Sequence, residues 1–114
     1  MDSLVLLSVE EFQKRLLRLT ALMGQKGIDA TIISDFANQY YLTGRVFSGY
    51  IYIPVKGLPV FFVKRPVKLE GDGVVYIRKP EEMAETIGLG APATLALELD
   101  TASYSAIHRL SAIF

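Results

Sequence analysis

The chain has 114 residues, of which 51% are hydrophobic and 11% aromatic, enough apolar material for the core of one folded domain. Twelve basic residues balance twelve acidic ones, which argues against nucleic-acid binders, whose affinity depends on a basic excess. Cysteine is absent, which excludes disulfides, thiolate nucleophiles and Cys-based zinc sites and fits a cytoplasmic protein.

The first predicted element is a helix over Ser8–Lys26. Ser8 and Glu11 have the spacing of a capping box, and Gly27 suits the left-handed position after the helix end. Apolar residues recur along this segment at spacings of three and four, which is the period of an amphipathic helix. They are Val9, Phe12, Leu16, Leu19 and Met23. The preceding apolar run, Leu4–Leu7, is too short for a signal peptide or a membrane span.

A buried strand is predicted over Asp29–Ser34, and a short helix over Ala37–Leu42 that Asp35 or Ser34 caps and Thr43-Gly44 ends. A strand over Phe47–Pro54 follows. Its alternation is predicted to place two tyrosines on one face and two isoleucines on the other. These residues are Tyr50, Tyr52, Ile51 and Ile53.

The remaining predicted elements are two strands, a helix, a strand and a helix, in that order. The Lys56-Gly57 turn and the Gly71–Gly73 break separate the strands, and Pro80 opens the third helix, which Gly88, Gly90 and Pro92 end. The elements cover Pro59–Val63, Val74–Ile77, the helix from Pro80, Thr94–Glu98, and a final helix from Asp100 or Thr101. The last helix reaches Phe114 without a stop signal, so we expect the chain to be cut from a longer protein.

Catalytic motifs are missing from the sequence. His108 is the only histidine, which rules out two-histidine metal motifs, and it is best interpreted as an exposed helical residue. Glu98 and Asp100 are better explained by a strand end and a helix cap than by a metal site. No G-x-S-x-G elbow, P-loop lysine or G-x-G-x-x-G pattern occurs. We therefore predict no catalytic residue and no metal site within this chain.

Four tyrosines and Arg45 cluster in one stretch of the sequence. Tyrosines beside a cation are able to stack nucleic-acid bases or line a peptide surface. The neutral charge of the chain favours structural and interface roles instead. The tyrosines are Tyr40, Tyr41, Tyr50 and Tyr52.

The order of several segments resembles the amino-terminal domain of the creatinase/prolidase family. An amphipathic helix precedes G-I-D-A-T-I-I at residues 27–33, and N-Q-Y-Y-L-T-G at 38–44 matches the family pattern N-x-x-Y-L-[ST]-G. A Phe-rich strand then ends in V-K-R at 63–65, an acidic helix start follows, and L-A-L-E-L-D occupies 95–100. The resemblance covers the chain from about Ser8 to Phe114.

This resemblance implies a ribonuclease H-like, three-layer α/β/α fold with a mixed sheet of five or six strands, residues 1–114 forming one domain. In the family, a pita-bread catalytic domain follows and holds two divalent metal ions (Mn, Co or Zn). That domain is absent from this sequence. The amino-terminal domain is implied to contact its own C-terminal catalytic domain, to help form a homodimer and to limit access to short proline-containing peptides.

Four residues are candidates for this substrate-access and interface role. Asn38 and Tyr41 match the family segment, and Arg65 matches a basic residue after the Phe-rich strand. Arg45 extends from the loop after Gly44. An arginine is able to clamp a peptide carboxylate with two hydrogen bonds, and a tyrosine provides a rigid wall with a hydroxyl. The alternative for Tyr41 is that it packs the second helix onto the sheet together with Leu42.

Three candidate functions follow from these observations. The first is a non-catalytic amino-terminal domain of a metal-dependent Xaa-Pro dipeptidase or aminopeptidase. The second is the same domain of a creatinase-type amidinohydrolase, which this part of the sequence does not distinguish. The third is a stand-alone binding module that uses the tyrosine-rich surface.

Overall fold

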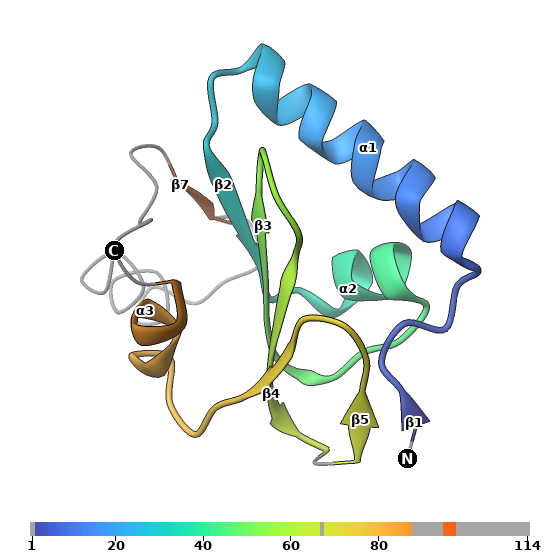
Figure 1. The fold of residues 1–114 in the computed structure, drawn as a ribbon, viewed down its shortest axis with the longest axis vertical. Helices are drawn as coiled ribbons and strands as arrows, with labels where there is room; N and C mark the ends of the chain where they lie inside the picture. Colours follow the sequence, from blue (N-terminus) through green and yellow to red (C-terminus); the bar gives the residue numbers. More distant parts are fainter. Residues whose placement is uncertain (1, 67, 88–94, 98–114) are drawn as a thin grey trace.

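A five-stranded mixed sheet forms the centre of the computed structural model, which describes residues 2–66, 68–87 and 95–97 (Figure 1). The strand order is β6-β4-β3-β2-β7. The β3 strand is antiparallel to both of its neighbours, whereas β2 pairs with β7 and β4 with β6 in parallel. The strands are β2 (Ala30–Ile33), β3 (Ser48–Pro54), β4 (Val60–Arg65), β6 (Val74–Tyr76) and β7 (Leu95–Leu97).

Helices cover both faces of this sheet. Figure 1 shows α1 (Val9–Gln25) and α2 (Phe36–Thr43) on one side of the strands and α3 (Glu82–Ile87) on the other. The predicted three-layer α/β/α fold around a mixed sheet is therefore confirmed, with five strands.

The α1 helix forms where its caps predict, and four residues of its predicted apolar stripe pack on the core, whereas Val9 in the first turn is 68% exposed. Ser8 is the N-cap, and its hydroxyl accepts a hydrogen bond from the Glu11 backbone N–H at 3.2 Å. The Glu11 carboxylate accepts a 2.8 Å bond from Arg15 Nε instead of returning to Ser8, so the capping box is only half formed. Lys26 is the C-cap and Gly27 has φ 69°, the left-handed conformation that glycine adopts without strain.

The α2 helix is one residue longer at each end than predicted. The Asp35 side chain caps it by accepting from the Asn38 N–H at 3.2 Å. Gly44 ends it with φ 80°, and its N–H donates to the Tyr40 carbonyl at 2.7 Å. The sequence N-Q-Y-Y-L-T-G thus forms most of a short helix and its glycine stop.

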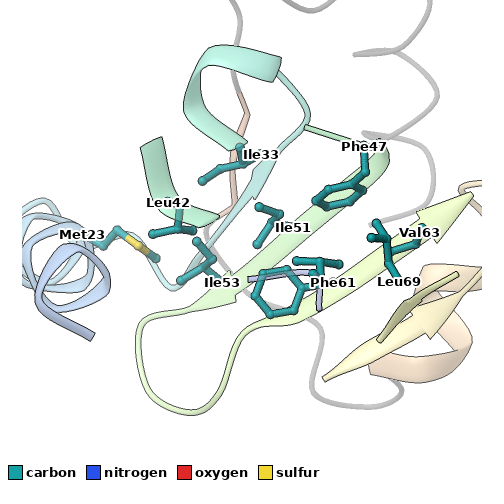
Figure 2. Packing of buried hydrophobic residues seen from close by; sticks show 10 residues of the cluster. Met23, Ile33, Leu42, Phe47, Ile51, Ile53, Phe61, Val63 and Leu69 are labelled. Atoms are coloured by element: carbon teal, nitrogen blue, oxygen red, sulfur yellow. The ribbon is translucent and has the colours of Figure 1, made fainter. Parts of the chain in front are cut away.

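The alternation along β3 divides the core between the two faces, as predicted. Ile51 and Ile53 pack in the cluster under α1 and α2, and Tyr50 and Tyr52 pack in the cluster on the α3 face. Figure 2 shows the first cluster, in which side chains from α1, β2, α2, β3, β4 and β5 meet. Its buried members are Leu4, Met23, Ile33, Leu42, Phe47, Ile51, Ile53, Phe61, Val63 and Leu69. Those of the α3-face cluster are Ala30, Ile32, Tyr52, Phe62, Ile77 and Met83.

The sequence analysis missed a small parallel sheet between β1 (Asp2–Ser3) and β5 (Leu69–Glu70). Leu4, which follows β1, is fully buried, and its N–H donates to the Glu70 carbonyl at 2.8 Å. Strands of two residues are too short to show a period, so only the contacts made by the folded chain identify them.

The other predicted strands agree with the structure to within two residues. The β4 strand continues to Arg65, past the predicted end at Val63. The register between β3 and β4 shifts at Ser48 and Gly49, which forms a bulge. The predicted C-terminal helix, together with Glu98, Asp100 and His108, lies outside the described residues.

Candidate functional site

A hollow of about 310 Å³ opens between α1, β2 and α2. Its apolar lining comes from all three elements, as Leu19, Ile33 and Leu42. Its polar lining also comes from all three elements and consists of Arg15, Thr31, Asn38 and Tyr41. A concave site that combines apolar walls with a few polar groups is the usual form of a small-molecule site.

Arg15 and Tyr41 form the most ordered part of this hollow. The Arg15 guanidinium carbon lies 4.6 Å from the centre of the Tyr41 ring, a cation–π contact, and Nη1 donates to the Tyr41 carbonyl. The ion pair between Arg15 Nε and Glu11 holds the guanidinium from the other side at 2.8 Å. Two helices thereby fix one arginine at the rim of the hollow.

Arg15 and the neighbouring cations lower the pKa of the Glu11 carboxyl. The hydrogen bond from Arg15 lowers the pKa of the Glu11 carboxyl from its ordinary value of 4.5, with further lowering by the charges of Arg15, Lys14 and Arg18. Glu11 therefore stays ionised near neutral pH and keeps the Arg15 guanidinium in place.

The structure brings together two of the four predicted site residues. Asn38 and Tyr41 both line the hollow, and Tyr41 is 48% exposed, so it is not a core residue as Leu42 is. Arg45 and Arg65 are not among its lining residues. Arg45 Nε donates to the Ser3 carbonyl at 3.2 Å, and Arg65 is exposed at the end of β4, opposite Ser48 of β3.

Buried polar residues hold the loop that follows α2. Gln39 is fully buried, accepts from the Phe47 N–H at 3.1 Å and donates to the Gly49 carbonyl at 3.3 Å. The Thr43 hydroxyl donates to the Gln39 carbonyl at 2.7 Å and accepts from the Arg45 N–H at 3.1 Å. These bonds satisfy polar groups that burial would otherwise penalise, and they fix α2 against the start of β3.

A family model matches most of the sequence. The model of the creatinase/prolidase N-terminal domain matches residues 15–114. The chain therefore belongs to this family. The match includes Arg15 and every lining residue of the hollow.

Several solved structures share the fold. An Xaa-Pro aminopeptidase from Streptococcus pyogenes has 24% identity and a TM-score of 0.77, over 91% of this chain and 85% of that one. The N-terminal domain of an X-Pro dipeptidase from the same organism has 23% identity and a TM-score of 0.75, over 89% and 88%. An Xaa-Pro dipeptidase from Bacillus anthracis has 19% identity and a TM-score of 0.72, over 90% of this chain and 31% of that one. No protein of curated function matches the sequence significantly.

Metal ligands are not gathered in the described part of this creatinase/prolidase N-terminal domain. Within residues 2–66, 68–87 and 95–97, no three His, Cys, Asp or Glu side chains are grouped so that they could hold an ion. The residues present there do not fit a metal centre. Among the described helices, none is long and apolar enough to cross a membrane.

Sequence reasoning missed Arg15 and Thr31 as lining residues of the hollow. Arg15 had a local signal, since a glutamate four residues earlier on a helix favours an ion pair. Its contact with Tyr41 bridges 26 positions of the chain, and no local pattern encodes that separation. The four tyrosines lie close together in the sequence but are separated in the structure. Tyr40 and Tyr41 lie on α2, on one side of the sheet, while Tyr50 and Tyr52 pack on the other.

Proposed function

We propose that this chain is the non-catalytic amino-terminal domain of a metal-dependent Xaa-Pro dipeptidase or aminopeptidase. The observation that carries the proposal is the family match over residues 15–114. The likeness to the N-terminal domain of an X-Pro dipeptidase, over nearly the full length of both chains, supports it. In this proposal residues 1–114 form one domain of a cytoplasmic protein, and the pita-bread catalytic domain follows it.

The two divalent metal ions (Mn, Co or Zn) of such a peptidase would be bound by that downstream domain. The described residues of this chain provide no cluster of ligands for them. The chain's contribution is accordingly to shape the route of short proline-containing peptides and to make contacts within a homodimer.

The outer side of α2 suits a contact role. Phe36 and Tyr40, one helical turn apart, are 59% and 63% exposed. Large aromatic side chains are enriched where proteins contact one another, because they bury much area with few rotatable bonds. We propose that the C-terminal catalytic domain or the second subunit covers this side of α2.

Asn38, Tyr41, Arg45 and Arg65 remain our candidates for substrate access. Arg65 has the exposed position that a peptide carboxylate would require, at the end of β4. Arg45 is bonded to the Ser3 carbonyl, which suits a structural role in holding the N-terminal strand. Of the two arginines, Arg65 is thus the better candidate for a contact with substrate.

Hydrolysis assays test the assignment of catalysis to another domain. The purified chain, incubated with Xaa-Pro dipeptides and Mn²⁺, Co²⁺ or Zn²⁺ in turn, is expected to release no proline. The natural reading frame past codon 114 is expected to encode Asp, His and Glu metal ligands. Proline release by the 114-residue chain, or a frame without such ligands, would contradict the proposal.

The pocket encoded by that reading frame also separates the peptidase from the creatinase-type amidinohydrolase. A protein that carries both domains is expected to cleave Xaa-Pro dipeptides and to leave creatine unchanged. Creatine hydrolysis without dipeptide cleavage would favour the amidinohydrolase.

The role of Arg65 is testable in the same two-domain protein. Arg65→Ala is expected to raise KM for Xaa-Pro dipeptides and leave kcat nearly unchanged, because the side chain would bind substrate without touching the reacting atoms. Arg78→Ala is the control, since Arg78 is an arginine whose side chain is 95% exposed near α3. Equal KM values for both variants and the parent would remove Arg65 from the site.

A further inference from the structure

The hollow between α1, β2 and α2 has the composition of a binding site for an amphipathic small molecule. Its apolar lining comes from Leu19, Ile33 and Leu42, of which Ile33 and Leu42 belong to the buried core. A rigid apolar surface of this kind favours an aliphatic group, because burial removes that group from water.

A cation at the rim is held ready for an anionic group. The guanidinium of Arg15 carries five N–H donors, and its bonds to Glu11 and to the Tyr41 carbonyl use two of them. The cation–π contact with Tyr41, at 4.6 Å from the ring centre, helps to hold the group in place before any ligand arrives. Preorganisation of this kind reduces the entropy that binding costs, and a planar guanidinium matches the two oxygens of a carboxylate.

The local charge permits an anion despite the presence of Glu11. Residues 9–18 of α1 include Glu10 and Glu11 but also Lys14, Arg15 and Arg18, so three cations face two carboxylates in this stretch. The hydrogen bond from Arg15, together with the charges of Arg15, Lys14 and Arg18, lowers the pKa of the Glu11 carboxyl, so these cations partly offset its negative charge. Asp35 is committed to the Asn38 N–H as the cap of α2.

The size of the hollow limits the ligand. Its volume of about 310 Å³ is at the lower end of the range for small-molecule pockets. A molecule of amino-acid size is therefore small enough to fit.

We propose that this hollow binds a small aliphatic monocarboxylate, with the carboxylate on Arg15 and the aliphatic tail against Leu19, Ile33 and Leu42. The site lies beyond the proposed peptidase function and does not depend on it. The chain would bind such a compound whichever reaction its parent protein catalyses.

Titration of the ¹⁵N-labelled 114-residue chain with 4-methylpentanoate, followed by NMR, tests the proposal. We expect amide shifts concentrated at residues of α1, β2 and α2 around the hollow. The dissociation constant is expected to be millimolar, as is typical for a ligand of about eight non-hydrogen atoms. An absence of saturable shifts up to about 50 mM, far above that constant, would overturn the proposal, as would shifts that map elsewhere.

Two changes of ligand separate the parts of the site without altering the protein. 4-Methylpentanamide has the same tail and no charge, and acetate has the charge and no tail. Each is expected to bind at least about tenfold more weakly than 4-methylpentanoate, because each loses one of the two contacts. Equal affinity for the amide would exclude the role of Arg15, and equal affinity for acetate would exclude the apolar tail site.

Variants of α1 supply the matching test on the protein. Arg15→Gln is expected to weaken 4-methylpentanoate binding about tenfold and to leave the binding of the amide unchanged. Arg18→Gln removes the same charge from an exposed position of the same helix that does not line the hollow. Equal weakening by both variants would show a general charge effect and overturn the proposed contact.

Discussion

The two faces of the central sheet use neighbouring residues of the same strands but are covered differently. On one face, α1, which has 17 residues, and the shorter α2 pack over Phe61, Ile51 and Ile53. On the other, the six-residue α3 packs over Phe62 and Tyr52. Among the described residues, the buried polar side chains Thr31, Gln39 and Thr43 belong to β2 and α2.

The two faces differ in what their described side chains are able to contribute to stability and to ligand binding. Among the described residues, the buried cluster on the α3 face consists of apolar and aromatic side chains and closes the core. The α1/α2 face combines an equally buried core with a hollow whose rim is polar. A polar group beside a hollow is able to form a hydrogen bond with a ligand, whereas an apolar layer provides only surface for hydrophobic contact. Among the described residues, the hollow that we propose as a binding site lies on the α1/α2 face.

The largest expected effect comes from adjacent phenylalanines that face opposite sides. Phe61 and Phe62 are 2% and 0% exposed, so Phe61→Ala and Phe62→Ala are each expected to lower the free energy of unfolding by about 3–5 kcal/mol. Urea denaturation measures both, and Leu58→Ala, at an 83% exposed position, should change it by less than about 0.5 kcal/mol. A near-neutral Phe62→Ala would mean that the α3 face is not a true core.

Two glycines are expected to respond to alanine with opposite signs. At Gly49, φ is 153° and a Cβ would lie 2.0 Å from the Phe62 carbonyl oxygen, so Gly49→Ala should destabilise by about 1–3 kcal/mol or more. Gly24 lies inside α1, where a Cβ meets only Val55 at 4.0 Å, so Gly24→Ala should stabilise by about 0.5–1 kcal/mol. Thermal unfolding followed by circular dichroism compares them, and a stable Gly49→Ala protein would contradict the tight bulge.

A smaller effect is expected at alkaline pH on the α3 face. Burial, followed by the charge of Asp29, raises the pKa of the Tyr52 hydroxyl above its ordinary value of 10.0. Folding thus favours the neutral phenol, and this contribution to stability is complete below pH 10.0 and is lost as pH rises through the folded-state pKa. Tyr52→Phe should lose less stability than the parent as pH rises above 10.0 in urea titrations. The exposed Tyr40→Phe should behave as the parent does, and identical curves for all three would disprove this coupling.

The smallest effect is expected from the ion pair on α1. The pKa of Glu11 is lowered, so its contribution is present above the ordinary value of 4.5 and is lost as pH falls through the folded-state pKa. Glu11→Gln should slightly lower the melting temperature at pH 7 and leave it close to that of the parent at pH 3. Glu10→Gln removes the other acidic residue of the first turn and serves as the control. A larger loss from Glu10→Gln than from Glu11→Gln would mean that the helix dipole, and not Arg15, is the main partner of these carboxylates.

Local patterns predicted the elements of this domain well. Ser8 and Gly27 bound the first helix, Asp35 and Gly44 bound the second, and the alternation along β3 sorts its side chains as expected. Each signal depends on residues within a few positions of one another, which is the range over which backbone geometry and capping act. The order of these segments also predicted the family.

The candidate site was only partly predictable. Asn38 and Tyr41 were selected from a sequence motif and do line the hollow, but Arg45 and Arg65 lie elsewhere. The arginine beside Tyr41 is Arg15, which belongs to another helix.

The sequence by itself therefore determined the described helices, the longer strands, most of their buried faces and the family of this protein. Only the tertiary structure decided which arginine meets Tyr41, how the four tyrosines divide between two faces, and that β1 pairs with β5. The physical reason is the range of the interactions. Propensity, capping and periodicity act between near neighbours, whereas a hollow exists only where segments far apart in the chain pack against one another.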